Sequence, residues 1–147
     1  MKKFRIGFDS GGLLLFLVVM LPNFIWFAIP SPNDILRRES VTVTLDTAAS
    51  VFQVLMAASL IFVIHPGRKP LRLAGLLGVI GCAVLYYSGW ILYYLGWAGW
   101  FVILLLTVPP CLALLLYAAC RRNTSALILG IGFTCCHLVY AVANFMI

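Results

Sequence analysis

The sequence predicts an all-α fold, a polytopic membrane bundle in which residues 1–147 form a single domain of five transmembrane helices. The first observation is composition: 64% of the residues are hydrophobic and 10% are charged, whereas soluble domains carry about 25% charged residues. A chain of this size cannot bury so much apolar surface in one core, so lipid must surround much of it. The second observation is that the apolar residues fall into five runs, each near the length of about 20 residues that a helix needs to cross a bilayer.

These runs define the expected helices in chain order. The first, residues 11–29, follows a basic N-terminus that resembles the start of a signal peptide. Its length, and the lack of a small-residue cleavage pattern after it, predict a retained helix instead. Residues 96–99 leave room only for a tight turn between the third and fourth runs. The other four runs cover residues 47–64, 71–95, 100–120 and 125–147.

Basic residues predict which way the chain crosses the membrane, because short cytoplasmic loops are enriched in Lys and Arg. If the N-terminus is cytoplasmic, the cytoplasmic segments hold eight of the ten basic residues, and only Arg37 and Arg38 lie outside. We therefore expect a plasma (inner) membrane protein with a cytoplasmic N-terminus and an extracytoplasmic C-terminus. The eight residues form short clusters and no basic face, which argues against nucleic-acid binding. They are Lys2, Lys3, Arg5, Arg68, Lys69, Arg72, Arg121 and Arg122.

The longest connection, residues 30–46, is expected on the outer side. Ser31 suits the N-cap position of a helix, Pro32 the first helical position, and Asp34 the positive end of the helix dipole. These residues predict a short interfacial helix over residues 35–40.

The end of this connection, residues 41–44, alternates apolar and polar residues and is expected to be extended. Thr44 or Asp46 then caps the second membrane helix. Two interpretations of the whole connection remain open at this point. It is either a plain linker or a lid over whatever the helices enclose.

Polar and aromatic residues gather at one depth in the expected bundle. With a rise of about 1.5 Å per residue, members of all five helices fall in the outer half, whereas the inner half holds little beyond Ser59 and Tyr117. A polar group that faces lipid unpaired costs several kcal/mol, so these side chains should turn inward. The candidate ligand-binding residues are Asn23, Trp26, Gln53, Tyr86, Tyr87, Trp90, Tyr94, Thr107, His137, Tyr140 and Asn144.

The spacing of these residues predicts a cavity. His137, Tyr140 and Asn144 are three and four residues apart and share one face of the fifth helix, while Tyr86 and Trp90 share one side of the third. Two such faces opposite each other would form an aromatic-walled cavity with a few hydrogen-bonding groups, the usual composition of a small-molecule site. In the plainer interpretation, the amides only bond neighbouring helices and His137 is a satisfied core residue.

Prolines lie at the same depth as the polar residues. Each proline removes a backbone donor and frees a carbonyl about four residues earlier, here near Val18 for Pro22 and near residues 105–106 for the pair at 109–110. Freed carbonyls are tolerated where they line a cavity or find a partner. The prolines are therefore consistent with a widened outer half or with simple bends.

No catalytic or metal-binding motif appears. The five cysteines lie in or at the ends of apolar runs without a C-x-x-C pair, so we expect small buried side chains and neither disulfides nor a zinc site. One intramembrane histidine without a carboxylate is a poor metal site, and no cofactor is expected. Nucleophile elbows, phosphate loops and HExxH sequences are missing, which favours a non-enzymatic protein.

In plan, the chain is similar to the translocator-protein (tryptophan-rich sensory protein) family. The shared features are five helices in a short chain, here of 147 residues, 14% aromatic content, and the longest loop between the first two helices. That family binds porphyrins and sterol-like ligands, so the resemblance implies a tetrapyrrole or similar ligand. The Trp/Pro-rich signature of the family has no counterpart in residues 44–52, and no residue role is transferred.

The sequence thus favours a membrane protein that binds a small apolar or amphipathic ligand, such as a lipid or tetrapyrrole, in an outward-facing aromatic cavity. Membrane lipid is the expected partner. One alternative is a small membrane transporter that works as a homodimer. Another is an immunity protein or a subunit of a larger membrane complex.

Overall fold

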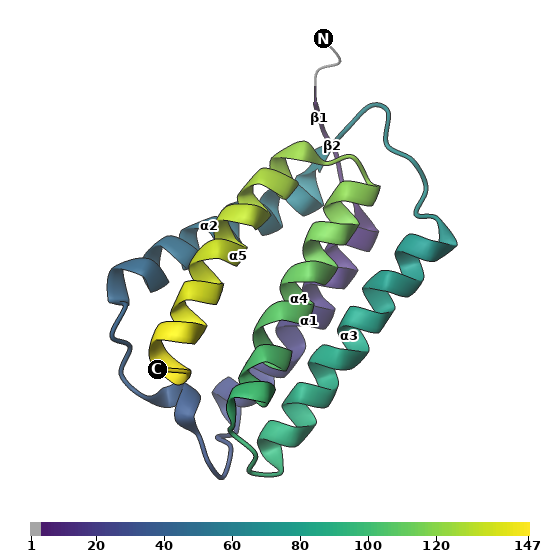
Figure 1. The fold of residues 1–147 in the computed structure, drawn as a ribbon. Helices are drawn as coiled ribbons and strands as arrows, with labels where there is room; N and C mark the ends of the chain where they lie inside the picture. Colours follow the sequence, from purple (N-terminus) through teal and green to yellow (C-terminus); the bar gives the residue numbers. More distant parts are fainter. Residues whose placement is uncertain (1–3) are drawn as a thin grey trace.

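A computed structural model describes residues 4–147, and its helices account for almost all of the regular structure (Figure 1). All five long helices have the length and apolar composition needed to cross a membrane, which confirms the predicted all-α class and the number of membrane-length helices. Lys2 and Lys3, which the orientation prediction uses, lie outside the described residues. The elements are β1 (Arg5–Ile6), α1 (Ser10–Ala28), the 3₁₀ turn η1 (Ile35–Arg37), α2 (Val43–Phe62), β2 (Val63–Ile64), α3 (Leu73–Tyr94), α4 (Trp100–Cys120) and α5 (Thr124–Phe145).

The helices form two groups that diverge toward one end of the bundle. Helix α3 packs along α4, and α2 packs along α5. In Figure 1, α2 and α5 lie close to the other helices at the top and lean away from them toward the bottom. The converging end, which holds Asp9 and Arg121, is termed the Asp9 end. The diverging end, which holds the connection between α1 and α2, is termed the Asp34 end.

Small residues permit close contact between the helices. A methyl group added at Gly78 of α3 would lie 2.7 Å from the Leu116 side chain of α4. A methyl group at Gly12 of α1 would lie 2.7 Å from the carbonyl oxygen of Leu60 in α2. Such close approach maximises dispersion contacts, which stabilise helix association in lipid.

A buried carboxylate fastens the Asp9 end. The Asp9 side chain caps α1 by accepting hydrogen bonds from the backbone N–H groups of Gly11 and Gly12, at 3.1 and 3.3 Å. It also accepts the Tyr117 hydroxyl at 2.9 Å and forms an ion pair with Arg121 at 3.1 Å. Burial raises the pKa of the Asp9 carboxyl, but these hydrogen bonds and the Arg121 charge outweigh it and leave the pKa below its ordinary value.

A second polar residue joins α5 to α2 at the same end. Asn123 caps α5 by accepting the N–H of Ala126 at 3.1 Å, and its amide donates to the carbonyl oxygens of Ser59 and Val63, both at 2.9 Å. The Ser59 hydroxyl also bonds that of Ser125 at 2.7 Å. The Asp9 end therefore has more polar contacts than the sequence predicts, because the capping residues Asp9 and Asn123 lie just outside the apolar runs and point into the bundle.

The connection between α1 and α2 differs from the prediction. The expected helix over residues 35–40 is only the 3₁₀ turn of residues 35–37. Ser31 caps nothing there: it is buried, and its hydroxyl donates to the carbonyl oxygen of Tyr93 at 2.9 Å. Tertiary bonds to α3 have thus replaced the predicted local cap.

Helix α2 begins at Val43, so the predicted extended conformation is wrong for residues 43–44. Thr42 precedes the first helical residue, and neither Thr44 nor Asp46 is the N-cap. Asn144 of α5 explains the early start, since its amide oxygen accepts the Val41 N–H and its amide nitrogen donates to the Thr42 hydroxyl, both at 2.8 Å. These bonds hold the chain against the end of α5 and let the helix begin at once.

Candidate ligand-binding cavity

A cavity of about 360 Å³ lies between the two diverging groups of helices, in the half of the bundle near the Asp34 end. All five helices and Leu36 of η1 contribute to its wall. Most of the lining is aromatic or aliphatic. The polar members are Asn23, Asp46, Ser50, Gln53, Thr107 and His137, with the hydroxyl and indole groups of the aromatic residues.

The structure brings eight of the eleven predicted site residues together around this cavity. It places the other three elsewhere. Tyr87 donates to the carbonyl oxygen of Val18 at 2.7 Å, and Tyr94 to that of Ile29 at 2.6 Å. The Asn144 amide forms hydrogen bonds with Val41 and Thr42, just before α2. Ligand binding itself stays a prediction for the eight, which are Asn23, Trp26, Gln53, Tyr86, Trp90, Thr107, His137 and Tyr140.

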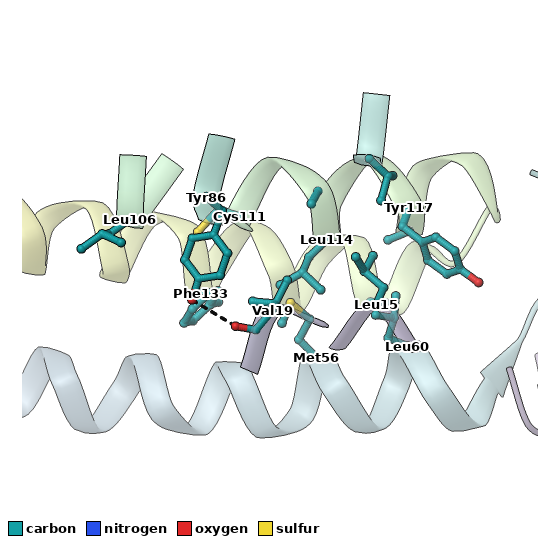
Figure 2. Packing of buried hydrophobic residues seen from close by; sticks show 14 of the residues in the cluster. Leu15, Val19, Met56, Leu60, Tyr86, Leu106, Cys111, Leu114, Tyr117 and Phe133 are labelled. Carbon is teal, nitrogen blue, oxygen red and sulfur yellow. Dashed lines mark hydrogen bonds between the residues drawn. The ribbon is translucent and has the colours of Figure 1, made fainter. Parts of the chain in front are cut away.

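Hydrogen bonds fix the wall between α1 and α3. The Tyr86 hydroxyl donates to the carbonyl oxygen of Val19 at 3.0 Å, as Figure 2 shows. The Asn23 amide donates to the Tyr86 hydroxyl at 2.8 Å and to the Val19 carbonyl at 3.1 Å. Asn23 therefore joins two helices, as the plainer interpretation of the intramembrane amides expects.

Trp90 is the centre of an aromatic cluster on this wall. Its ring centroid lies 6.5 Å from that of Trp26, 6.3 Å from Tyr86, 5.8 Å from Tyr93 and 6.1 Å from Tyr94. The side chain is only 6% exposed, and its indole N–H makes no hydrogen bond of normal geometry to residues 4–147. The indole nitrogen is sealed from the cavity surface, and the Tyr86 hydroxyl is the polar group that it approaches.

The opposite wall is built by α5 and α2. His137 stacks between Phe133 and Tyr140, with centroid distances of 5.1 and 6.2 Å and interplanar angles of 17° and 13°. Gln53 spans from α2 to α1, where its amide nitrogen lies 3.4 Å from the sulfur of Met20, a weak acceptor. This wall offers stacked rings and weakly engaged polar groups.

Among the cavity residues that the sequence reasoning missed, Asp46 is the charged one, and Ser50 is also polar. The prediction began the second helix at residue 47, which left Asp46 in the loop as a cap. Because α2 begins at Val43, Asp46 lies on the helical face that also carries Ser50 and Gln53. The spacing of four and three residues was a usable signal, but only with the helix start known.

Asp34 fixes the connection over this end of the bundle. Its carboxylate accepts hydrogen bonds from the Trp26 indole N–H at 2.9 Å and from the Tyr93 hydroxyl at 2.8 Å. It also forms an ion pair with Arg37 at 2.8 Å. Burial raises the pKa of the Asp34 carboxyl, but these hydrogen bonds outweigh it, so the pKa lies below its ordinary value. The N–H of Leu36, which lines the cavity, donates to the Tyr93 hydroxyl at 3.1 Å.

Within residues 4–147, no group of three or more His, Cys, Asp or Glu side chains is placed to hold a metal ion. The arrangement is suited to non-covalent binding by aromatic surface and a few polar atoms. Comparison of the chain with protein-family models, curated protein sequences and solved structures gives no match. The similarity in plan to the translocator-protein family therefore rests on helix number, aromatic content and loop position alone.

Proposed function

We propose that this integral membrane protein binds a small apolar or amphipathic ligand, such as a lipid or tetrapyrrole, in the cavity near the Asp34 end. The observation that carries the proposal is the contrast between the two halves of the bundle. One half has a cavity of about 360 Å³ that opens toward the surface, while in the other half side chains of α1, α2 and α4 pack into one cluster.

The size and lining of the cavity support binding. Small-molecule sites usually have volumes of about 300–1,000 Å³, apolar and aromatic walls, and a small number of polar groups that orient the ligand. Here the Gln53 amide donates only to the Met20 sulfur, a weak acceptor, and Trp90 and His137 contribute ring surface to the lining. A ligand can engage the Gln53 amide without displacing a strong hydrogen bond.

The filled half favours binding over transport. Side chains from α1, α2 and α4 pack together there, as Leu15, Leu60 and Tyr117 in Figure 2 show. Beyond them, the bonds of Asp9 to Tyr117 and Arg121 join α1 to the end of α4. A transporter would have to break these contacts to open a pathway.

The proposed orientation places the Asp34 end outside, in a plasma membrane. Basic residues support it: Arg68, Arg121 and Arg122 gather at the Asp9 end, where Arg68 approaches the Asp9 carboxylate at 3.9 Å and Arg121 bonds the Lys69 carbonyl at 3.0 Å. Short cytoplasmic segments carry such residues. The cavity would then be reached from the outer leaflet or the outer solution.

The experiment is to purify the protein in lipid nanodiscs, extract it and identify bound small molecules by mass spectrometry. The variant Ala49→Leu/Ala141→Leu fills the cavity, because both alanines line it and are at most 7% exposed. Ala119→Leu, on the exposed face of α4, is the matched control. We expect one compound class to be retained by the wild type and the control and lost from the filled variant. Identical extracts from all three proteins would contradict the proposal.

A further inference from the structure

We infer that the cavity selects an organic cation, an ammonium group joined to an apolar or aromatic body, with Asp46 as its counter-charge. The inference rests on the proposed function and names the chemical class of its ligand. The same chemistry occurs in free quaternary or protonated amines and in the headgroups of choline and ethanolamine lipids.

The first argument is the sign of the charge. With His137 counted as neutral, Asp46 is the one formal charge among the described residues that line the cavity. In residues 4–147, no Lys or Arg nitrogen lies within 4.0 Å of its carboxylate, since the ion pairs there involve only Asp9 and Asp34. A carboxylate beside low-dielectric walls repels anions and favours a cation.

Arg37 does not cancel the negative charge of Asp46. Arg37 lies over the Trp26 ring, 4.7 Å from its centroid, but its guanidinium is paired with Asp34 at 2.8 Å. Asp46 accepts a hydrogen bond from the Thr42 hydroxyl at 3.1 Å, which is a neutral donor. Asp46 is half-buried in the first turn of α2, so the helix dipole stabilises its charge, and no Lys or Arg side chain among residues 4–147 pairs with it.

The second argument is the aromatic wall. The face of an aromatic ring attracts a cation within about 6 Å of its centroid, and alkylammonium groups are often enclosed by such faces. Trp90 and Tyr86 on one wall, and Tyr140 on the other, contribute rings to the lining of the same cavity, and the outer face of Tyr140 is the one that His137 does not cover.

The test uses the full chain in dodecyl maltoside micelles, which carry neither charge nor ammonium. Choline phenyl ether combines a quaternary ammonium, an ether oxygen and a ring, and 3,3-dimethylbutyl phenyl ether is its neutral carbon isostere. Phenoxyacetate is the anionic comparison. Calorimetric titration of wild type should give at least roughly tenfold tighter binding of the cation than of the isostere, and no binding of the anion.

Asp46→Asn keeps the size of the side chain and its ability to accept a hydrogen bond from the Thr42 hydroxyl. It should weaken cation binding by about tenfold and leave binding of the isostere unchanged. Glu39→Gln removes a charge from an exposed position of the connection between α1 and α2 and should change the binding of neither ether. Asp46→Glu should keep the preference. If Asp46→Asn fails to fold, the comparison of the two ethers on wild type still decides.

The outcomes separate the inference from the proposed function. Equal affinity of wild type for the cation and its isostere overturns the cation preference and leaves the cavity as a binding site. Binding no tighter than to the filled variant Ala49→Leu/Ala141→Leu, for all three probes, overturns both. Displacement of choline phenyl ether by an equal concentration of potassium chloride assigns an inorganic cation and also overturns the inference.

Two further competitors identify the source of the cation. Displacement of the probe by phosphatidylcholine, and not by phosphatidylglycerol, supports the inference with a lipid headgroup as ligand. Displacement by tetramethylammonium, and not by phosphatidylcholine, supports it with a free organic cation as ligand.

Discussion

The hydroxyl of Tyr87 lies 2.7 Å from the carbonyl oxygen of Val18. Pro22, four residues after Val18, has no N–H, so this carbonyl has lost its donor within α1. Tyr87 supplies the missing hydrogen bond from α3. The contact explains both how α1 continues through its proline and why Tyr87 faces α1 instead of the cavity.

This relationship predicts a coupling between the two side chains. Tyr87→Phe removes the donor and should lower the free energy of unfolding by about 1 kcal/mol. In a Pro22→Ala background, the new backbone N–H can bond the Val18 carbonyl, so the same substitution should cost clearly less. Unfolding of the four proteins in mixed micelles measures the difference. Equal costs in the two backgrounds would show that Tyr87 acts independently of the proline.

Asp9 should contribute stability that depends on its charge. Asp9→Asn retains a capping oxygen but loses the ion pair with Arg121, and we expect a loss of about 2 kcal/mol at neutral pH. Because the folded-state pKa of Asp9 is lowered, its contribution is complete above the ordinary pKa of 3.8 and is lost as pH falls through the lower folded-state value.

Unfolding curves of wild type and Asp9→Asn, measured from neutral pH to below 3.8, test this. The difference between the two proteins should shrink toward zero in acid. Asp34, whose pKa is also lowered, is present in both proteins and cancels in the comparison. A difference that is constant over the whole range would mean that the Asp9 charge is not the source of the stability.

Asp34 should protect the connection between α1 and α2. Asp34→Ala removes the acceptor for Trp26, Tyr93 and Arg37, and we expect trypsin to cut after Arg37 or Arg38 roughly fivefold faster. Val41→Ala is the control, since that side chain is exposed and lies away from the two cleaved bonds. Unchanged cleavage of Asp34→Ala would show that the connection is held by other contacts.

The proposed orientation predicts which loop faces the outside of the cell. Glu39→Cys and Lys69→Cys place thiols at exposed positions of opposite ends of the bundle. A membrane-impermeant maleimide added to intact cells should label Glu39→Cys, and should label Lys69→Cys only after permeabilisation. Wild type, whose five cysteines all lie in helices, measures the background. The reverse pattern would contradict the orientation.

The spans could be read from the sequence because hydropathy and the length of a membrane-crossing helix fix them locally. The fourth predicted run coincides with α4, Trp100–Cys120, and the third differs from α3 by at most two residues at either end. The depth of the polar residues was also readable from helical rise, which is why eight of the eleven candidates meet at one cavity.

The remaining features depend on contacts between distant residues. The start of α2 follows from bonds that Asn144 makes to residues 41 and 42, about a hundred positions earlier in the chain. The role of Ser31 likewise follows from the carbonyl of Tyr93. Local capping preferences predict neither the start of α2 nor the role of Ser31. Because the start of α2 was placed too late, Asp46 was not recognised as a cavity residue.

The central claim is that the half of the bundle near the Asp34 end encloses a ligand site. A density map of the protein in lipid nanodiscs tests it most directly, at the space between Trp90, Gln53 and His137. We predict continuous non-protein density there, in contact with the Gln53 amide. Side chains that close the space, or isolated waters alone, would contradict the claim.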